Sequence, residues 1–186
     1  MAFTFRAAER ARRFDPGRTL ARRDDADLPF LGAEAAAGNG LLLDTCVYID
    51  QMQGRAPPTV QDCLDIRIVH HSMVAVQELM HTVGILDPDD PRSARAVAAI
   101  ERVVDAMPPH RLLLPDAETL ASAAVHAGIL CRRQGYGKDG RFRAFNNCVL
   151  FLQARKLGLT LLTRNVGDID ILLQMRPDGR ALFYRT

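Results

Sequence analysis

The sequence predicts an α/β fold with a parallel sheet that helices cover on both faces. Two observations predict it. Short segments rich in apolar residues, at 41–43, 66–69, 111–114 and 159–163, are separated by longer segments whose apolar residues recur at helical spacing. The short segments are apolar along their length rather than alternating, which is typical of strands buried on both faces of a sheet. A last strand is expected at 181–184.

Start and stop signals bound the first helices. Two short helical pieces, at 47–52 and 60–64, lie on either side of a Pro-Pro pair that breaks the chain. Ser72 follows the second strand and can cap a helix, because its hydroxyl accepts from the free amides of the first turn. The helix that it starts is mostly apolar and is expected to end at Gly84.

The next two helices have clear first turns. A proline suits the first turn of a helix, so Pro91 is expected to begin a helix that reaches about residue 107. Asp116 is expected to cap a helix that ends near residue 133. The glycine-containing stretch 135–141 is then expected to be a loop.

A fifth longer segment has one apolar face. Its apolar residues fall at i, i+3, i+4 and i+7: Phe145, Cys148, Val149 and Leu152. This spacing predicts a helix that ends at Gly158, directly before the fourth strand. A short helix at 168–175 follows that strand.

Composition is that of an ordinary globular domain. Of the 186 residues, 48% are hydrophobic and 25% are charged, so the chain can bury a core without disulfides or metals to staple it. The net charge of +2 gives no overall basic field, so nucleic-acid binding would depend on local patches. The four cysteines lack metal-type C-x-x-C spacing, which indicates reduced thiols and a cytoplasmic location. No apolar run reaches the roughly 18 residues of a membrane helix, and no secretory signal pattern opens the chain.

Residues 1–39 differ from the domain expected at 40–186. They carry seven arginines within residues 6–27, mixed with five acidic residues, and a Pro-Gly pair interrupts them. Residues 35–40 read as a flexible approach to the first strand. Two interpretations stay open: a solvated arm that packs loosely on the domain, or a basic arm that binds RNA or a partner protein.

Acidic and amide side chains gather where strands end. Asp44 directly follows the first strand, and Glu78 lies about two turns into the helix after the second. Asn147 is expected near the start of its helix, and Asn165 and Asp168 follow the fourth strand. In a parallel sheet these ends can converge on one edge. Clustered carboxylates need a cation or a proton, and oxygen ligands without a His or Cys cluster suit Mg²⁺ or Mn²⁺. The alternative is a set of helix caps and solvated charges.

Four sequence blocks resemble PIN-domain ribonucleases, and most of all the VapC-like toxins of toxin–antitoxin pairs. They are residues 41–45, 76–84, 145–158 and 161–169, in the order of the family. The resemblance implies a three-layer α/β/α sandwich on a central parallel sheet and Mg²⁺- or Mn²⁺-dependent cleavage of RNA. It also implies a homodimer and a cognate antitoxin protein that inhibits it.

The resemblance also implies a set of catalytic and metal-binding positions. Asp44 takes the first metal-ligand position and Glu78 the second. The third, usually an acid after an asparagine, is Asn147 here; the fourth is Asn165, with Asp168 as a nearby acid. An amide supplies no charge, and the loss of one charge beside a cation costs up to about 4 kcal/mol at 4 Å and an effective dielectric constant of 20.

Asn147 leaves the activity open. It is either an introduced Asp→Asn change or the native residue of a weakened enzyme. Three functions remain: a toxin endoribonuclease, a catalytically impaired PIN domain that binds RNA or protein without cutting, and a PIN-type nuclease outside any toxin system.

Several other residues have a functional and a structural interpretation. Thr45 and Thr163 either orient a metal-bound group or cap the next turn. Four basic residues either hold RNA phosphates or lie in solvent: Lys138, Arg141, Arg143 and Arg164. Aromatic Tyr48 and Phe142 either stack on a base or pack in the protein. The remaining histidines and acids are expected to be structural or solvated: His70, His71, His81, Asp50, Asp62 and Asp65.

Overall fold

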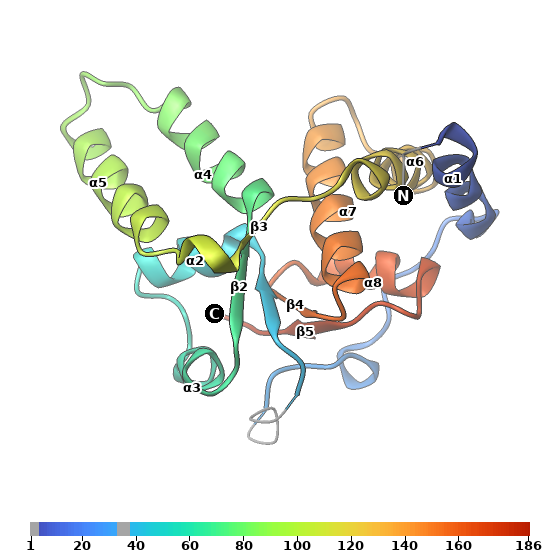
Figure 1. Cartoon of the computed structure of the whole chain (residues 1–186), viewed down its shortest axis with the longest axis horizontal. Helices are drawn as coiled ribbons and strands as arrows, with labels where there is room; N and C mark the ends of the chain where they lie inside the picture. Colours follow the sequence, from blue (N-terminus) through green and yellow to red (C-terminus); the bar gives the residue numbers. More distant parts are fainter. Residues whose placement is uncertain (1–3, 33–37) are drawn as a thin grey trace.

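The computed structural model describes residues 4–32 and 38–186. The central sheet has five strands, all parallel, in the order β3-β2-β1-β4-β5 (Figure 1). The strands are β1 (Leu41–Leu43), β2 (Val69–Ser72), β3 (Leu112–Leu113), β4 (Thr160–Thr163) and β5 (Ala181–Phe183). The central strand β1 pairs with β2 through Leu41 and Val69, and with β4 through Leu41 and Thr160. The carboxyl ends of β1 and β4 therefore lie side by side.

Helices cover both faces of the sheet. They are α2 (Thr45–Met52), α3 (Pro58–Ile66), α4 (Met73–Ile85), α5 (Pro91–Asp105), α6 (Ala117–Gln134), α7 (Gly140–Lys156) and α8 (Val166–Met175). Along β1, Leu42 packs into a core with α6, α7 and α8, whereas Leu41 and Leu43 pack into a second core with α2 to α5. Successive side chains of a strand point to opposite faces. The predicted α/β fold is thus confirmed as a three-layer sandwich.

Two element boundaries differ from the prediction in a way that matters for the site, and other ends shift by one to three residues. The second strand was expected at 66–69 but begins at Val69, because α3 continues to Ile66. Helix α7 begins at Gly140, so the loop expected over 135–141 is shorter and Asn147 lies two turns inside the helix instead of near its start. The loop begins at Gly135, whose φ of +70° ends α6 in the left-handed conformation.

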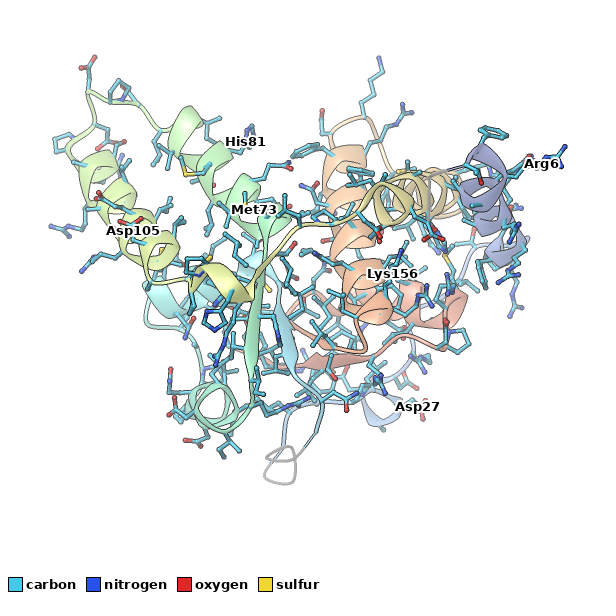
Figure 2. The ribbon with its side chains drawn as sticks, viewed as in Figure 1. Arg6, Asp27, Met73, His81, Asp105 and Lys156 are labelled. Atoms are coloured by element: carbon cyan, nitrogen blue, oxygen red, sulfur yellow. The ribbon has the colours of Figure 1, made fainter. Side chains whose placement is uncertain are left out.

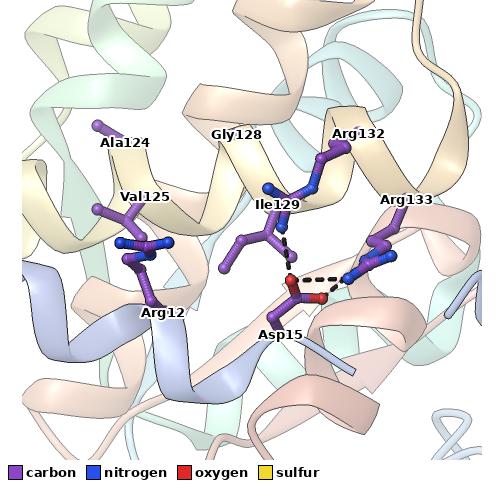
Figure 3. Close-up of a pocket in the computed structure, with 8 residues that line it drawn as sticks. All are labelled: Arg12, Asp15, Ala124, Val125, Gly128, Ile129, Arg132 and Arg133. Carbon is purple, nitrogen blue, oxygen red and sulfur yellow. Dashed lines mark hydrogen bonds and ion pairs between the residues drawn. The ribbon is translucent and has the colours of Figure 1, made fainter. Parts of the chain in front are cut away.

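The N-terminal segment contacts the sandwich in several places. Its described residues, 4–32 and 38–39, include α1 (Phe5–Glu9) and the 3₁₀ turns η1 (Arg10–Phe14) and η2 (Asp25–Asp27). Asp15 accepts hydrogen bonds from Arg132 and Arg133 of α6, beside a hollow between η1 and that helix (Figure 3). Phe30 forms a parallel bridge with Phe183 of β5. Part of the flexible approach expected at 35–40, residues 35–37, lies outside the described residues.

No helix within residues 4–32 and 38–186 has both the length and the apolar character needed to cross a membrane. The four cysteines are free thiols.

Candidate active site

Asp44 lies at the junction of β1 and α2. It occupies the N-cap position of α2, and its amide donates to the carbonyl of Leu162 in β4 at 3.0 Å, which fixes it at the sheet edge. Its Oδ2 atom accepts from the Thr163 hydroxyl and from the Cys46 thiol. The residue is only 6% exposed. Asp44 is therefore a buried carboxylate held by neutral donors.

Glu78 reaches the same region from α4. Figure 2 shows α4 rising from Met73 at the end of β2 to His81 away from the sheet, and Glu78 lies between these two residues. Its carboxylate accepts from the Thr45 hydroxyl and, at 2.7 Å, from the side-chain amide of Asn146. Because Thr45 follows Asp44 in the chain, this contact holds the two acids near each other.

Asp168 is the third acid and lies in the first turn of α8. Its Oδ1 accepts from the Tyr136 hydroxyl, and its Oδ2 accepts from the side-chain amide of Asn147 at 2.7 Å. Asn165 caps α8 by accepting from the Asp168 amide at 3.3 Å, and its own side chain donates to Oδ2 at the same distance. The Arg143 guanidinium lies 3.6 Å from Oδ2. The surrounding protein thus supplies Asp168 with several donors.

Thr163 joins the two parts of the site. Its hydroxyl donates to Asp44 and accepts from the backbone amide of Asn165 at 2.9 Å. Strand β4 therefore links the acid of β1 to the cap of α8. Such contacts link the five predicted ligand positions in one chain of neighbours, but Asp44 and Glu78 have no direct contact with Asn147 or Asp168 among the described residues. Both threonines donate to the carboxylate of a neighbour.

Burial governs the charge of the two acids near α2. Loss of solvent raises the pKa of Asp44 above its ordinary value, although bonds from Thr163 and Cys46 oppose this. Loss of solvent also raises the pKa of Glu78; the bonds from Thr45 and Asn146 oppose it, and the nearby Asp44 charge adds to it. Both groups favour the protonated form more than solvated acids do, and a cation between them would reverse this preference.

The oxygen atoms of the site suit a hard divalent cation that only a few carboxylates hold. Within the described residues, no group of three or more His, Cys, Asp or Glu side chains is placed to hold a metal ion. The pair of Asp44 and Glu78 remains, and Mg²⁺ needs only one or two carboxylates when waters and substrate phosphates complete its shell. The Oδ1 atom of Asn146 is buried and has no hydrogen-bond partner among the described residues, so a neutral oxygen is also left to serve a cation.

A cavity of about 720 Å³ opens beside this site. Four arginines line it together with Cys46 and Asp168: Arg22, Arg143, Arg164 and Arg185. We call it the arginine cavity. Two of the predicted RNA-binding residues, Arg143 and Arg164, therefore face it, whereas Lys138 is exposed in the loop before α7 and is not among its lining residues.

The prediction that Asp50 faces solvent is wrong. Asp50 is a fully buried residue of α2. It accepts from Arg164 at 2.7 Å, from Tyr184 at 2.7 Å and from Arg55 at 3.1 Å. It thereby holds Arg164 at the wall of the arginine cavity. The burial of Asp50 could have been predicted from helical spacing, because residue 50 follows the buried Val47 by three positions and lies on the same helix face.

Other predicted residues have structural surroundings. Tyr48 is 3% exposed and its hydroxyl lies 2.8 Å from Nδ1 of His71, so it packs in the core. Phe142 is half exposed near His81, with ring centroids 6.1 Å apart. The sequence reasoning did not find Tyr136, Arg22 or Arg185, which lie far from the four family blocks.

Comparison with known proteins bears on the fold. No protein-family model matches the chain, and no curated protein matches it significantly. Among solved structures, it is similar to a chain of VapBC2 from Rickettsia felis bound to promoter DNA, with 11% identity and a TM-score of 0.53 over 78% of this chain and 98% of that one. FitAcB from Neisseria gonorrhoeae has 22% identity and a TM-score of 0.53 over 77% of this chain and 96% of that one. VapBC-5 from Mycobacterium tuberculosis, of the VapBC family of toxin–antitoxin systems, has 20% identity and a TM-score of 0.50 over 78% of this chain and 99% of that one.

The chain has the fold of a VapC-like PIN domain. The resemblance drawn from the four sequence blocks is thus confirmed at the level of the fold. In this PIN-like fold, Asp44 lies between β1 and α2, while Glu78 and Asp168 belong to α4 and α8. The carboxyl ends of β1 and β4 are neighbours in the sheet.

Proposed function

We propose that this protein is a Mg²⁺- or Mn²⁺-dependent endoribonuclease, the toxin of a toxin–antitoxin pair, with an activity weakened by Asn147. The observation that carries the proposal is the pair of the buried Asp44 and the partly buried Glu78, close to the arginine cavity that Cys46, a contact of Asp44, lines. A carboxylate pair suits a hard cation, and guanidinium groups suit the phosphates of a nucleic acid.

The site residues have separate tasks in this proposal. Asp44 and Glu78 would hold the ion, with Asn146 as a neutral oxygen donor. A bound divalent ion activates water and stabilises charge on the scissile phosphate. Thr45 and Thr163 keep the two carboxylates in place through their hydroxyl donors. Arg143 and Arg164 would bind backbone phosphates, which position the RNA without reading its sequence.

Asn147 supports the weakened activity. Its amide donates to Asp168, a contact that a carboxylate at 147 could not make. Asp168 is then occupied by Asn147, Tyr136 and Arg143 rather than left for an ion. The site therefore has two acids that a cation can claim, where the resemblance implies a larger acidic set.

The second candidate is a PIN-like domain that binds RNA or protein without cutting. The hydrogen bond from Asn147 to Asp168 favours this second candidate, because it gives the Asp168 carboxylate a protein partner when no metal is bound. The two candidates differ in one measurement: cleavage of a labelled RNA pool in Mg²⁺ or Mn²⁺ against EDTA. Metal-dependent cleavage that Glu78→Gln abolishes supports the nuclease, and RNA binding without cleavage at any metal concentration supports the second candidate.

A protein partner is part of the proposal. The structures with the same fold are VapBC and FitAcB complexes, and we propose a homodimer and a cognate antitoxin for this chain in the cytoplasm. Met80 and Ile85 are 51% and 69% exposed on α4, and a partner would cover such an apolar surface. Light scattering of the purified protein, alone and with the product of a neighbouring small gene, tests both associations.

A further inference from the structure

We propose that the N-terminal segment forms one wall of the RNA groove, where Arg22 and Arg185, joined by Asp25, bind one backbone phosphate next to the metal site. This rests on the proposed RNA substrate. Arg22 and Arg185 line the arginine cavity, which Asp168 and Cys46 also line. The two arginines come from opposite ends of the chain, so the groove is complete only when the N-terminal segment is in place.

The backbone on both sides of Arg22 is fastened to α8. The carbonyl of Ala21 accepts from Gln174 at 2.9 Å, and the amide of Arg23 donates to Asp170 at 2.8 Å. Asp170 is fully buried and also accepts from the Arg23 guanidinium at 2.7 Å. Because α8 also carries Asp168, this clamp fixes Arg22 relative to the candidate active site.

Further contacts hold the segment on either side of this clamp. The carbonyl of Leu20 accepts from Gln134 of α6 at 3.2 Å. Leu31 donates to the carbonyl of Phe183 at 2.6 Å, so the segment runs along the edge of β5. Arg185 lies over the ring of Phe30, 4.8 Å from its centroid. The segment is therefore anchored both to a helix and to the sheet, which favours a preformed wall rather than a loose arm.

Charge favours a phosphate at this wall. Asp25 accepts from both Arg22 and Arg185, so one carboxylate lies between two guanidinium groups and one net positive charge remains. Asp50 likewise accepts from both Arg55 and Arg164, which leaves one more net positive charge beside the cavity that Arg164 lines. The side chains of Arg22 and Arg185 are 41% and 60% exposed, so both can reach a ligand. Two clusters that each carry one net positive charge match the singly charged phosphates of a nucleic-acid strand.

The salt dependence of RNA binding tests the proposal. A fluorescein-labelled 12-nucleotide oligouridine is titrated with the full chain in EDTA, where metal-dependent cleavage is off, at several salt concentrations. For a single strand, the slope of log K against log salt changes by about 0.7 for each phosphate neutralised. Either Arg22→Gln or Arg185→Gln makes the remaining arginine neutral with Asp25. Each single variant should therefore lower the slope by about 0.7.

Two control variants sharpen the test. Arg18→Gln removes the same charge from the same segment at an exposed position outside the cavity lining, and it should leave the slope unchanged. Asp25→Asn removes the carboxylate between the two arginines and should make the slope steeper, which a purely structural role of this cluster would not do. Circular dichroism verifies that each variant is folded.

The outcomes separate this proposal from the proposed function. Equal slopes for wild type, Arg22→Gln and Arg185→Gln would overturn the phosphate assignment, even if the protein cuts RNA in Mg²⁺. A weaker salt dependence of RNA binding in these two variants supports the phosphate assignment even if the protein cuts no RNA. In that case only the nuclease proposal fails. If a labelled 12-residue polyglutamate binds in an Arg22-dependent way and oligouridine does not, the groove belongs to an acidic protein partner and the RNA assignment is overturned.

Discussion

Replacing Asn147 by Asp would turn a hydrogen bond into a contact between two acids. The Nδ2 atom of Asn147 lies 2.7 Å from Oδ2 of Asp168, and both residues are 5% exposed. In Asn147→Asp a carboxylate oxygen takes the place of the amide donor. Without a cation, the variant must keep two buried negative charges together or take up a proton.

The cost follows from this geometry. Loss of a hydrogen bond to a charged group costs about 1.5–3 kcal/mol. Two like charges about 4 Å apart repel by about 4 kcal/mol at an effective dielectric constant of 20, and Arg143 beside Asp168 offsets part of this. Protonation of one acid sets a similar ceiling, because each unit of pKa is worth about 1.4 kcal/mol. A net loss of about 3–4 kcal/mol lowers Tm by roughly 6–16 °C in a chain of this size.

Thermal unfolding with and without metal measures this effect. In EDTA at pH 7.5, Asn147→Asp should melt well below wild type, and Mg²⁺ or Mn²⁺ should restore most of the difference because the ion binds the folded state. Repulsion between the two acids of the variant is relieved when one of them takes up a proton at low pH, so the gap in Tm to wild type should shrink at pH 5. Metal-dependent RNA cleavage should increase.

A neutral variant is the control. Asn147→Leu loses the hydrogen bond but adds no charge, so metal and pH should shift its Tm no more than they shift the Tm of wild type. If Asn147→Asp melts like wild type in EDTA, or cuts RNA no faster while its Mn²⁺ affinity is unchanged, the reasoning about this contact is refuted.

Three other predictions concern pH and packing. Burial raises the pKa of Asp44 and Glu78 in the folded state, so the stability that these acids contribute is complete below their ordinary pKa values and is lost as pH rises. From pH 4 to pH 7.5, the Tm of metal-free wild type should therefore fall relative to that of Asp44→Asn. A constant Tm difference would count against this reasoning. Asp50→Asn leaves two partly exposed arginines facing a neutral buried group and should cost about 1.5–3 kcal/mol in urea unfolding, the usual worth of hydrogen bonds to a charged group, whereas a loss under about 0.5 kcal/mol contradicts a stabilising role of the ion pairs. Gly179→Ala places a Cβ 2.3 Å from the ring of Phe151 and should cost about 1–3 kcal/mol, while the control Gly167→Ala, with nothing within 4 Å, should not.

Strand and helix order was predictable because burial and local signals agree. Leu41–Leu43 is apolar on both faces, and the helix caps at Ser72 and Asp116 form as expected. The second strand was misplaced because its residues include His70 and His71, which are only half buried near one edge of the sheet and show no apolar run. The start of α7 was missed because the helix opens on Gly140, a residue typical of loops, and has no side-chain cap bond.

The acids of the site were predictable from their place after strands, but their partners were not. The Tyr136 contact with Asp168 spans 32 residues, and that of Arg23 with Asp170 spans 147. Such contacts depend on how α6 and the N-terminal segment pack on α8, which periodicity along the chain does not encode. The arginine-rich segment could be recognised as unusual, but its position beside the site required the folded structure.

Binding of Mn²⁺ to the protein without RNA tests the central claim most directly. Isothermal titration should give one site for wild type and no binding heat for Asp44→Asn, an isosteric change that keeps an acceptor for Thr163. Asp62→Asn removes one exposed carboxylate from α3 and should bind like wild type. Undiminished Mn²⁺ affinity in Asp44→Asn would contradict the claim that Asp44 anchors a divalent-metal site.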